Sequence, residues 1–131
     1  MNTIQPGLTG TARMIVGTND TAPRVGSGKI EVLATPVMIG LIEEAALDAI
    51  EAALPPDMQS LGTHLDVSHI AATPTGMRVT ATARVTAVEG RTVTFAVEAT
   101  DEKETIGSGT HTRVVVTAAR FRARVAEKAG N

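Results

Sequence analysis

A hydroxyl, a carboxylate and an imidazole stand out in a chain that otherwise consists largely of Val, Ala and Thr in strand-like runs. Thr35 and Glu43 lie in the stretch ATPVMIGLIE, and His69 ends the stretch SLGTHLDVSH. The chain has no cysteine, so disulfides, thiolate nucleophiles and Cys-ligated zinc are excluded. Any catalysis must therefore use oxygen and nitrogen groups, with His as the natural proton carrier near neutral pH.

The composition predicts one globular domain over residues 1–131. Hydrophobic residues make up 43%, charged residues 20% and the net charge is −2, which argues against disorder and against an electrostatic grip on nucleic acid. Residues 1–7 show neither the basic nor the apolar region of a signal peptide, and no segment reaches the ~20 apolar residues of a membrane span. We expect a cytoplasmic protein whose partners include neither nucleic acid nor membrane.

The catalytic candidates must be positioned by a long helix and a set of strands. Helical patterns cover residues 35–54 and, in the tail, 118–128; strand-like runs cover 10–16, 30–33, 61–71, 77–88, 92–100 and 105–117. Turn residues at 89–90 and 101–104 make tight hairpins, which require antiparallel pairing. The helix is apolar almost all round, which predicts burial almost all round. This favours an α+β hot-dog fold, in which an antiparallel sheet wraps around one central helix and a second copy covers what one sheet leaves exposed.

Glu43 differs from the other acids of this helix. Glu44, Asp48 and Glu51 fall within one narrow, solvated stripe, whereas Glu43 shares a face with Ile39 and other apolar residues. A buried carboxylate is costly unless it is paired or functional. Glu43 is therefore either a functional carboxylate or the partner of a structural arginine, and its spacing alone does not separate the two.

His69, Thr35 and Gly62 each have a structural alternative. Alternation puts His69 on the apolar face of its strand, where a histidine is more often a core residue unless a carboxylate and a hydroxyl face it. Thr35, followed by Pro36, fits a helix cap, yet a helix N-terminus also suits an oxyanion. Gly62 either weakens its strand or admits a ligand close to the backbone.

The last strand and the tail carry glycines and cations. Gly107 and Gly109 are a weak phosphate signal, and a bulge or closely packed backbone is the more economical interpretation. Arg113 shares a face with His111 and could hold an anionic cofactor tail. For the basic residues of the tail, that role and a simply solvated terminus stay equally open: Arg120, Arg122, Arg124 and Lys128.

Several motifs in one order resemble the fluoroacetyl-CoA thioesterase family of hot-dog proteins. They are Thr35 with GLIE at 40–43, SLGT at 60–63 with His69, AATP at 71–74, VEGR at 88–91, and IGSGTH at 106–111 with Arg113. The similarity runs from about residue 34 to the C-terminus. It implies a homodimer, with association into a tetramer left open, that hydrolyses an acyl-CoA thioester.

The resemblance also implies the site residues. Thr35, Glu43 and His69 would form the catalytic set, Gly62 would offer its backbone N–H to the acyl group, and Arg113 would line the substrate site. The carboxylate of this family is thought to attack or to activate water, the His to move protons and the Thr to orient the carboxylate. No metal or separate cofactor is implied, because coenzyme A is part of the substrate.

One departure concerns the substrate. Members specific for fluoroacetate resemble one another in a phenylalanine-bearing lid before the helix, whereas residues 16–35 contain no aromatic residue. This argues against selectivity for fluoroacetate. The sequence thus predicts a thioesterase for short or medium acyl-CoA; the alternatives are a non-catalytic acyl-CoA-binding module and, last, a hot-dog hydratase.

Overall fold

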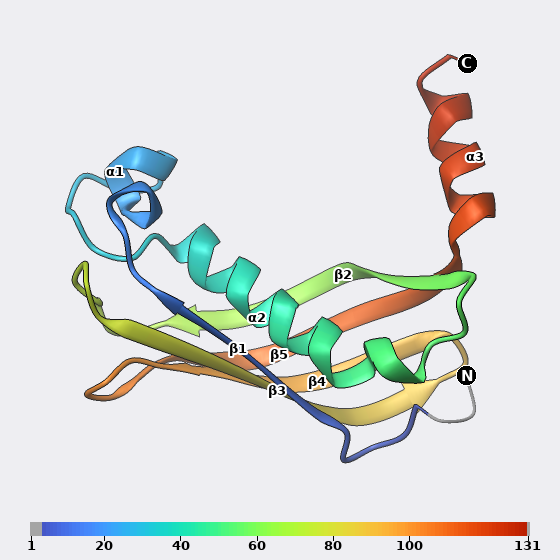
Figure 1. Ribbon diagram of the computed structural model, residues 1–131, viewed down its shortest axis with the longest axis horizontal. Coiled ribbons are helices and arrows are strands. Elements are labelled where there is room, and N and C mark those ends of the chain that lie inside the picture. The colour runs from blue at the N-terminus through green and yellow to red at the C-terminus, as the bar shows by residue number, and fades with distance from the viewer. Residues whose placement is uncertain (1–3, 131) are drawn as a thin grey trace.

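Five antiparallel strands curl around one long helix in the computed structural model, which describes residues 4–130 (Figure 1). The strands are β1 (Thr9–Ile15), β2 (Met58–His69), β3 (Arg78–Glu89), β4 (Thr92–Thr100) and β5 (Thr105–Thr117). Their order across the sheet is β1-β3-β4-β5-β2, so β1 and β2 are the two edges. The strand boundaries agree with the sequence to within three residues, except that residues 30–33 form no strand.

The segment before the long helix is held by loops rather than by a strand. It contains a 3₁₀ turn (Thr18–Asp20) and the short helix α1 (Ala22–Val25). Val32 and Leu33 form only isolated bridges, to Pro74 and Thr21 respectively. The prediction of a strand at 30–33 was therefore wrong: two apolar residues dock onto loops, and Ile30 is exposed.

The long helix α2 (Thr35–Ile50) ends in a 3₁₀ turn (Glu51–Ala53), and Pro55 and Pro56 then prevent a longer helix. Its buried residues pack on the concave face of the sheet with Phe95 at the centre: Met38, Leu41, Ile42, Ala45, Ala46 and Ile50. Gly10 on β1 contacts the backbone of Ala45 and Ala49, a close approach that any Cβ would prevent.

Burial of α2 is less complete than its composition predicts. Val37, Ile39 and Leu47 are only half-buried, and Thr35, Gly40 and Glu44 are exposed. The predicted solvated stripe is confirmed, since Glu44, Asp48 and Glu51 are all exposed. The sheet thus covers only one side of the helix, which leaves part of its apolar surface exposed.

A β-bulge in β2 decides which of its side chains face the helix. Gly62 pairs with Arg113 on β5 and His64 pairs with Thr112, so Thr63 is an extra residue. Ser60 and Gly62 precede the bulge, and Leu65, Val67 and His69 follow it. Because of the extra residue both groups face the same, concave side of the sheet, opposite buried residues of β5.

The C-terminal helix α3 (Ala118–Lys128) confirms the short helix predicted for the tail. It follows β5 directly and projects away from the body of the molecule, beyond the β2 edge of the sheet (Figure 1). None of its residues is buried. No helix in residues 4–130 is long and apolar enough to cross a bilayer.

Candidate active site

Thr35 and His69 form a hydrogen-bonded pair at the start of α2. Thr35 Oγ1 lies 2.7 Å from His69 Nδ1. Thr35 is the first helical residue rather than the cap, since Ala34 occupies the cap position without a side-chain hydrogen bond. The interpretation of Thr35 as a helix cap was therefore wrong, and its hydroxyl is committed to the imidazole.

The His69 ring is half-buried, and its environment favours the neutral form. Burial lowers the pKa of His69, and the nearby backbone of Ala71 opposes this only in part. Nε2 is buried and has no hydrogen-bond partner among the described residues. A neutral imidazole with one nitrogen held by Thr35 and the other unpartnered is poised to exchange a proton with a bound molecule.

Glu43 and Arg113 meet about two helical turns further along α2. Arg113 Nη1 donates to Glu43 Oε2 at 3.3 Å, and the Glu43 side chain is 37% exposed whereas that of Arg113 is 6% exposed. The interpretation of Glu43 as the partner of an arginine is therefore confirmed, whereas its function stays a prediction.

Gly62 lies directly against that carboxylate. A Cβ built on Gly62 would lie 2.5 Å from Glu43 Oε2 and 3.1 Å from His111 Cε1. The absence of a side chain at Gly62 therefore lets the carboxylate pack against the backbone of β2, where any larger residue would displace Glu43.

Arg113 is fixed by buried groups on its other sides. Its Nε donates to Ser60 Oγ at 2.9 Å and its Nη2 to the Ser60 carbonyl at 3.1 Å. Its Nη1 also donates to His111 Nε2 at 3.1 Å, while His111 Nδ1 donates to the carbonyl of His64 at 2.9 Å. These donors fix His111 as the neutral tautomer protonated on Nδ1, and burial lowers its pKa accordingly.

Ser60 and His111 are the members of this site whose roles the sequence did not reveal. Ser60 is 6% and His111 0% exposed. The sequence does show that His111 and Arg113 alternate onto one face of β5. It does not show that Ser60 lies on the same side of the sheet as His69, because this depends on the bulge in β2.

The sequence candidates form two groups within one protomer. Thr35 joins His69, and Glu43 joins Gly62 and Arg113, but no hydrogen bond links the two groups in residues 4–130. Eight residues of helix separate Thr35 from Glu43, a rise of about 12 Å. A single chain therefore holds two half-sites rather than one assembled triad.

The two glycines of β5 serve packing, as the more economical interpretation predicted. A Cβ on Gly107 would meet the Ser68 carbonyl at 2.7 Å and the Met38 sulfur at 2.8 Å. Gly109 has φ of +157° and contacts the Asp66 carbonyl. They allow β2 and α2 to approach β5 closely and form no phosphate loop. In the part of the chain that the structure describes, no cluster of three His, Asp or Glu side chains could hold a metal ion.

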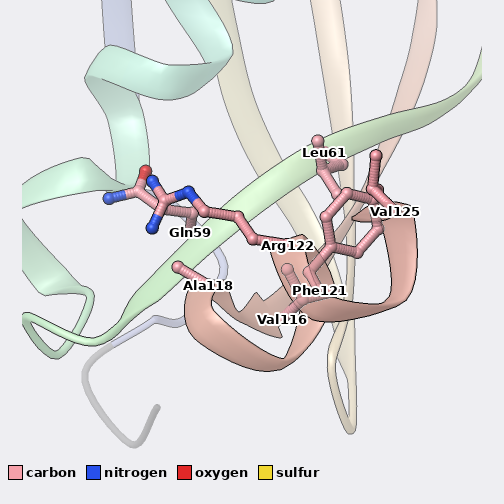
Figure 2. Close-up of a pocket in the computed structure, with 7 residues that line it drawn as sticks. All are labelled: Gln59, Leu61, Val116, Ala118, Phe121, Arg122 and Val125. Atoms are coloured by element: carbon pink, nitrogen blue, oxygen red, sulfur yellow. The ribbon is translucent and has the colours of Figure 1, made fainter. Parts of the chain in front are cut away.

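An apolar groove lies away from both half-sites, between α3 and the outer face of β2. Its volume is about 370 Å³. Figure 2 shows the ring of Phe121 beside Val125 and opposite Leu61, with Arg122 extending toward Gln59. This groove carries none of the candidate catalytic residues, so it is not the active site.

Known proteins that resemble this chain share its fold over nearly its whole length. The family described as fluoroacetyl-CoA-specific thioesterase matches residues 16–119. A fluoroacetyl-CoA thioesterase of Streptantibioticus cattleyicolor is 47% identical over 98 residues, which is 75% of this chain and 70% of that protein. A solved structure of a fluoroacetyl-CoA thioesterase has a TM-score of 0.90 at 38% identity and covers 95% of this chain and 97% of its own. A hot-dog-like protein of Thermanaerovibrio acidaminovorans has a TM-score of 0.86 at 26% identity, with 95% and 93% covered.

Proposed function

This chain belongs to the fluoroacetyl-CoA-specific thioesterase family, and we propose that it hydrolyses a short or medium acyl-CoA thioester with Glu43, His69 and Thr35 as its catalytic residues. The observation that carries these assignments is the bare backbone at Gly62 facing the Glu43 carboxylate. It places a candidate N–H donor directly beside a candidate base or nucleophile.

The chemistry follows from the groups on each half-site. The Glu43 carboxylate either attacks the carbonyl carbon, giving a mixed anhydride that water then hydrolyses, or takes a proton from the attacking water. The Gly62 N–H stabilises the negative charge that develops on the carbonyl oxygen. The neutral His69 ring accepts the proton that the attacking water releases and passes it to the CoA thiolate, and Thr35 holds the ring through Nδ1.

Arg113 keeps the Glu43 carboxylate in place rather than touching the reacting atoms. Its guanidinium is held by Ser60 and His111 before it reaches Glu43. The carboxylate therefore rests on a rigid partner and does not rotate freely toward solvent.

A homodimer would join the two half-sites, and this assembly is part of the proposal. β2 is a 12-residue edge strand with a run of exposed residues, and such an edge invites pairing with another strand. Antiparallel pairing of two β2 strands centred between Leu65 and Asp66 places His69 of one protomer opposite Gly62 of the other. Thr35 and His69 would then complete the site that holds Glu43 of the partner.

Loss of the carboxylate tests the catalytic assignment. Glu43→Gln keeps the size of the side chain, and we expect kcat for acyl-CoA hydrolysis to fall by about 10²–10⁴-fold, the range in which positioned acid–base groups act. CoA release is followed with a thiol-reactive dye, for which the protein has no cysteine background. Glu44→Gln, on the solvated stripe, is the control and should keep wild-type turnover. Near-normal turnover in Glu43→Gln would refute the assignment, and a protein that binds CoA esters without consuming them would be a binding module instead.

Mixed dimers test the shared site. Glu43→Gln and His69→Ala should each be inactive alone, whereas their heterodimer should regain one intact site and a measurable fraction of the wild-type rate. Failure of the heterodimer to recover any activity, with its formation confirmed by native mass spectrometry, would place all three catalytic residues on one chain.

The acyl group is expected to differ from fluoroacetate. No aromatic residue lies between Val16 and Thr35, and this segment is built of turns and the short helix α1. We propose that hydrolysis shows no preference for fluoroacetyl-CoA over acetyl-CoA beyond the greater intrinsic reactivity of the fluorinated ester. The ratio of kcat/KM for the two esters, compared with their ratio for hydroxide-catalysed hydrolysis, measures this.

A further inference from the structure

Helix α3 carries a concentration of positive charge that the rest of the molecule does not neutralise. Its basic residues are Arg120, Arg122, Arg124 and Lys128, and its one acid is Glu127. No acidic side chain lies within ion-pair distance of these cations in residues 4–130, where the one salt bridge joins Arg113 to Glu43. The whole chain has a net charge of −2, so the molecule is polarised, with its cations gathered on one projecting helix.

Three arginines line one hollow beside this helix. Arg91, from the turn between β3 and β4, lines a hollow of about 160 Å³ together with Arg120 and Arg124. No acidic residue lines this hollow. Like charges gathered in this way repel one another, and a bound anion removes that repulsion. Arginine is also the side chain best suited to bind phosphate oxygens in pairs.

The hollow also lies at the N-terminus of α3. Thr117, its cap residue, lines the hollow and makes no side-chain capping hydrogen bond. The N–H groups of the first helical turn add partial positive charge there. Two independent features, the arginines and the helix terminus, therefore favour a phosphate group at the same place.

Phe121 lines both this hollow and the apolar groove of Figure 2. The chain has two Phe and no Tyr or Trp; Phe95 is completely buried, whereas Phe121 is 37% exposed. An exposed aromatic ring flanked by arginines is an arrangement on which a nucleobase can stack while its phosphates are held. Leu61, Val116 and Val125 provide the apolar walls beside the ring.

We propose that α3 binds the 3′-phosphoadenosine diphosphate end of coenzyme A, with the adenine against Phe121 and phosphate oxygens on Arg91, Arg120 and Arg124. This rests on the proposed function, in which an acyl-CoA is the substrate. The groove lies close to the candidate catalytic residues along β2. Leu61 lines the groove on the outer face of the strand, and the next residue, Gly62, faces Glu43. The pantetheine arm would cross the β2 edge at residues 58–61, which extend beyond the end of the partner strand in the proposed β2–β2 pairing.

Calorimetric titration of the full-length protein with CoA, 3′,5′-ADP and pantetheine tests the proposal without requiring turnover. CoA is expected to bind at least tenfold more tightly than pantetheine, and 3′,5′-ADP, which lacks the pantetheine arm, to bind and compete with CoA. In the double variant Arg120→Ala, Arg124→Ala, CoA affinity is expected to fall at least tenfold and pantetheine affinity to stay within twofold. Phe121→Leu should weaken CoA and 3′,5′-ADP alike.

Arg13→Ala is the matched control, because Arg13 is an exposed arginine on β1 with no ion pair within the described residues. It should leave CoA affinity within twofold of wild type. The proposal is overturned if CoA and pantetheine bind equally, or if the double variant binds CoA like the wild type. Anionic lipid vesicles captured by wild-type protein, with CoA affinity unchanged in the double variant, would instead assign α3 to a membrane surface.

These results separate the two proposals. A protein that binds CoA through α3 but cleaves no thioester would retain the nucleotide site and lose the proposed activity. A protein that hydrolyses acyl-CoA and acyl-pantetheine with equal kcat/KM would retain the activity and lose the nucleotide site.

Discussion

Glu43 and Arg113 lie 70 residues apart in the chain, yet Arg113 Nη1 donates to Glu43 Oε2 at 3.3 Å. The arginine is buried and the carboxylate is partly exposed. Arg113 therefore anchors the pair, and the carboxylate of Glu43 remains accessible to solvent. Arginine cannot rotate away without breaking its bonds to Ser60 and His111. The position of the carboxylate therefore depends on residues that need not contact the substrate.

Gly62→Ala should inactivate the enzyme without unfolding it. The added Cβ would lie 2.5 Å from Glu43 Oε2, so the carboxylate must move. We expect kcat/KM to fall at least 10²-fold, because misplacing a reacting group by about 1 Å has an effect of this size. Gly40→Ala is the control, since a Cβ there meets nothing within 4 Å and should add up to about 1 kcal/mol of helix stability. Retained activity in Gly62→Ala would show that the close contact between Gly62 and Glu43 is not required.

We expect kcat to depend on the hydroxyl of Thr35 more than on the branched shape of its side chain. Thr35→Val removes the oxygen that lies 2.7 Å from His69 Nδ1 but keeps the branched side chain. We expect a decrease in kcat of about 10-fold or more, a cost of at least ~1.4 kcal/mol in transition-state stabilisation. Thr35→Ser should retain most of the rate. If steady-state kinetics show equal rates in the two variants, the hydroxyl does not orient His69.

Activity should fall on the acid side with a midpoint below the ordinary pKa of histidine. Burial lowers the pKa of His69 from 6.5, so the neutral ring persists at neutral pH and is protonated only at lower pH. The profile of kcat/KM, compared with NMR titration of the His69 ring, tests this. A midpoint above 6.5 would contradict it.

Stability should decrease over the same acidic range. Burial also lowers the pKa of His111, so both rings bind protons more readily in the unfolded chain than in the folded protein. Where the unfolded state binds more protons, the free energy of unfolding rises with pH. Their contribution is thus complete above about 6.5 and is lost as pH falls through the window between the two pKa values of each ring. Melting temperatures measured from pH 4 to pH 8 would show it, and His111→Leu should flatten the dependence.

His111→Leu should also reduce stability and weaken the hold on Arg113. The substitution removes the acceptor for Arg113 Nη1 and the donor to the His64 carbonyl, and unpaired buried groups of this kind cost about 1–3 kcal/mol each. Denaturant titration measures the loss. His64→Leu is the control, because the exposed His64 contributes its backbone carbonyl rather than its ring. Equal stability of the two variants would mean that the His111 hydrogen bonds are not required.

Sequence reasoning went furthest where periodicity is strict. β4 and β5 begin and end at the predicted residues, because alternating apolar positions and clear turns bound them. Membership of the thioesterase family was identified from the order of weak motifs and is confirmed by the matches to known proteins. The hot-dog arrangement is likewise confirmed.

The contacts within the candidate active site could not be predicted from the sequence in the same way. Strict alternation places Gly62 on the same face as His64, whereas the bulge at Thr63 turns Gly62 toward the helix. The bonds among Arg113, Ser60 and His111 join residues up to 53 positions apart, and no local pattern reports them. That Thr35 pairs with His69 instead of capping the helix depends on which strand lies beside the helix terminus.

The extra residue in β2 also decides which changes of length this strand tolerates. Deleting Thr63 would leave Gly62 opposite Arg113 and His64 opposite Thr112, now as neighbours in a regular ladder, so Ser60, Gly62 and Leu65 would all keep the inner face. Deleting a second residue together with Thr63 would shift the side-chain period by one. Residues on the N-terminal side of the deletion would then exchange their faces, and Ser60 would turn away from Arg113. The bulge is thus a spare residue, whose loss removes a local bend but leaves the inner site and the outer groove on their own sides of the sheet.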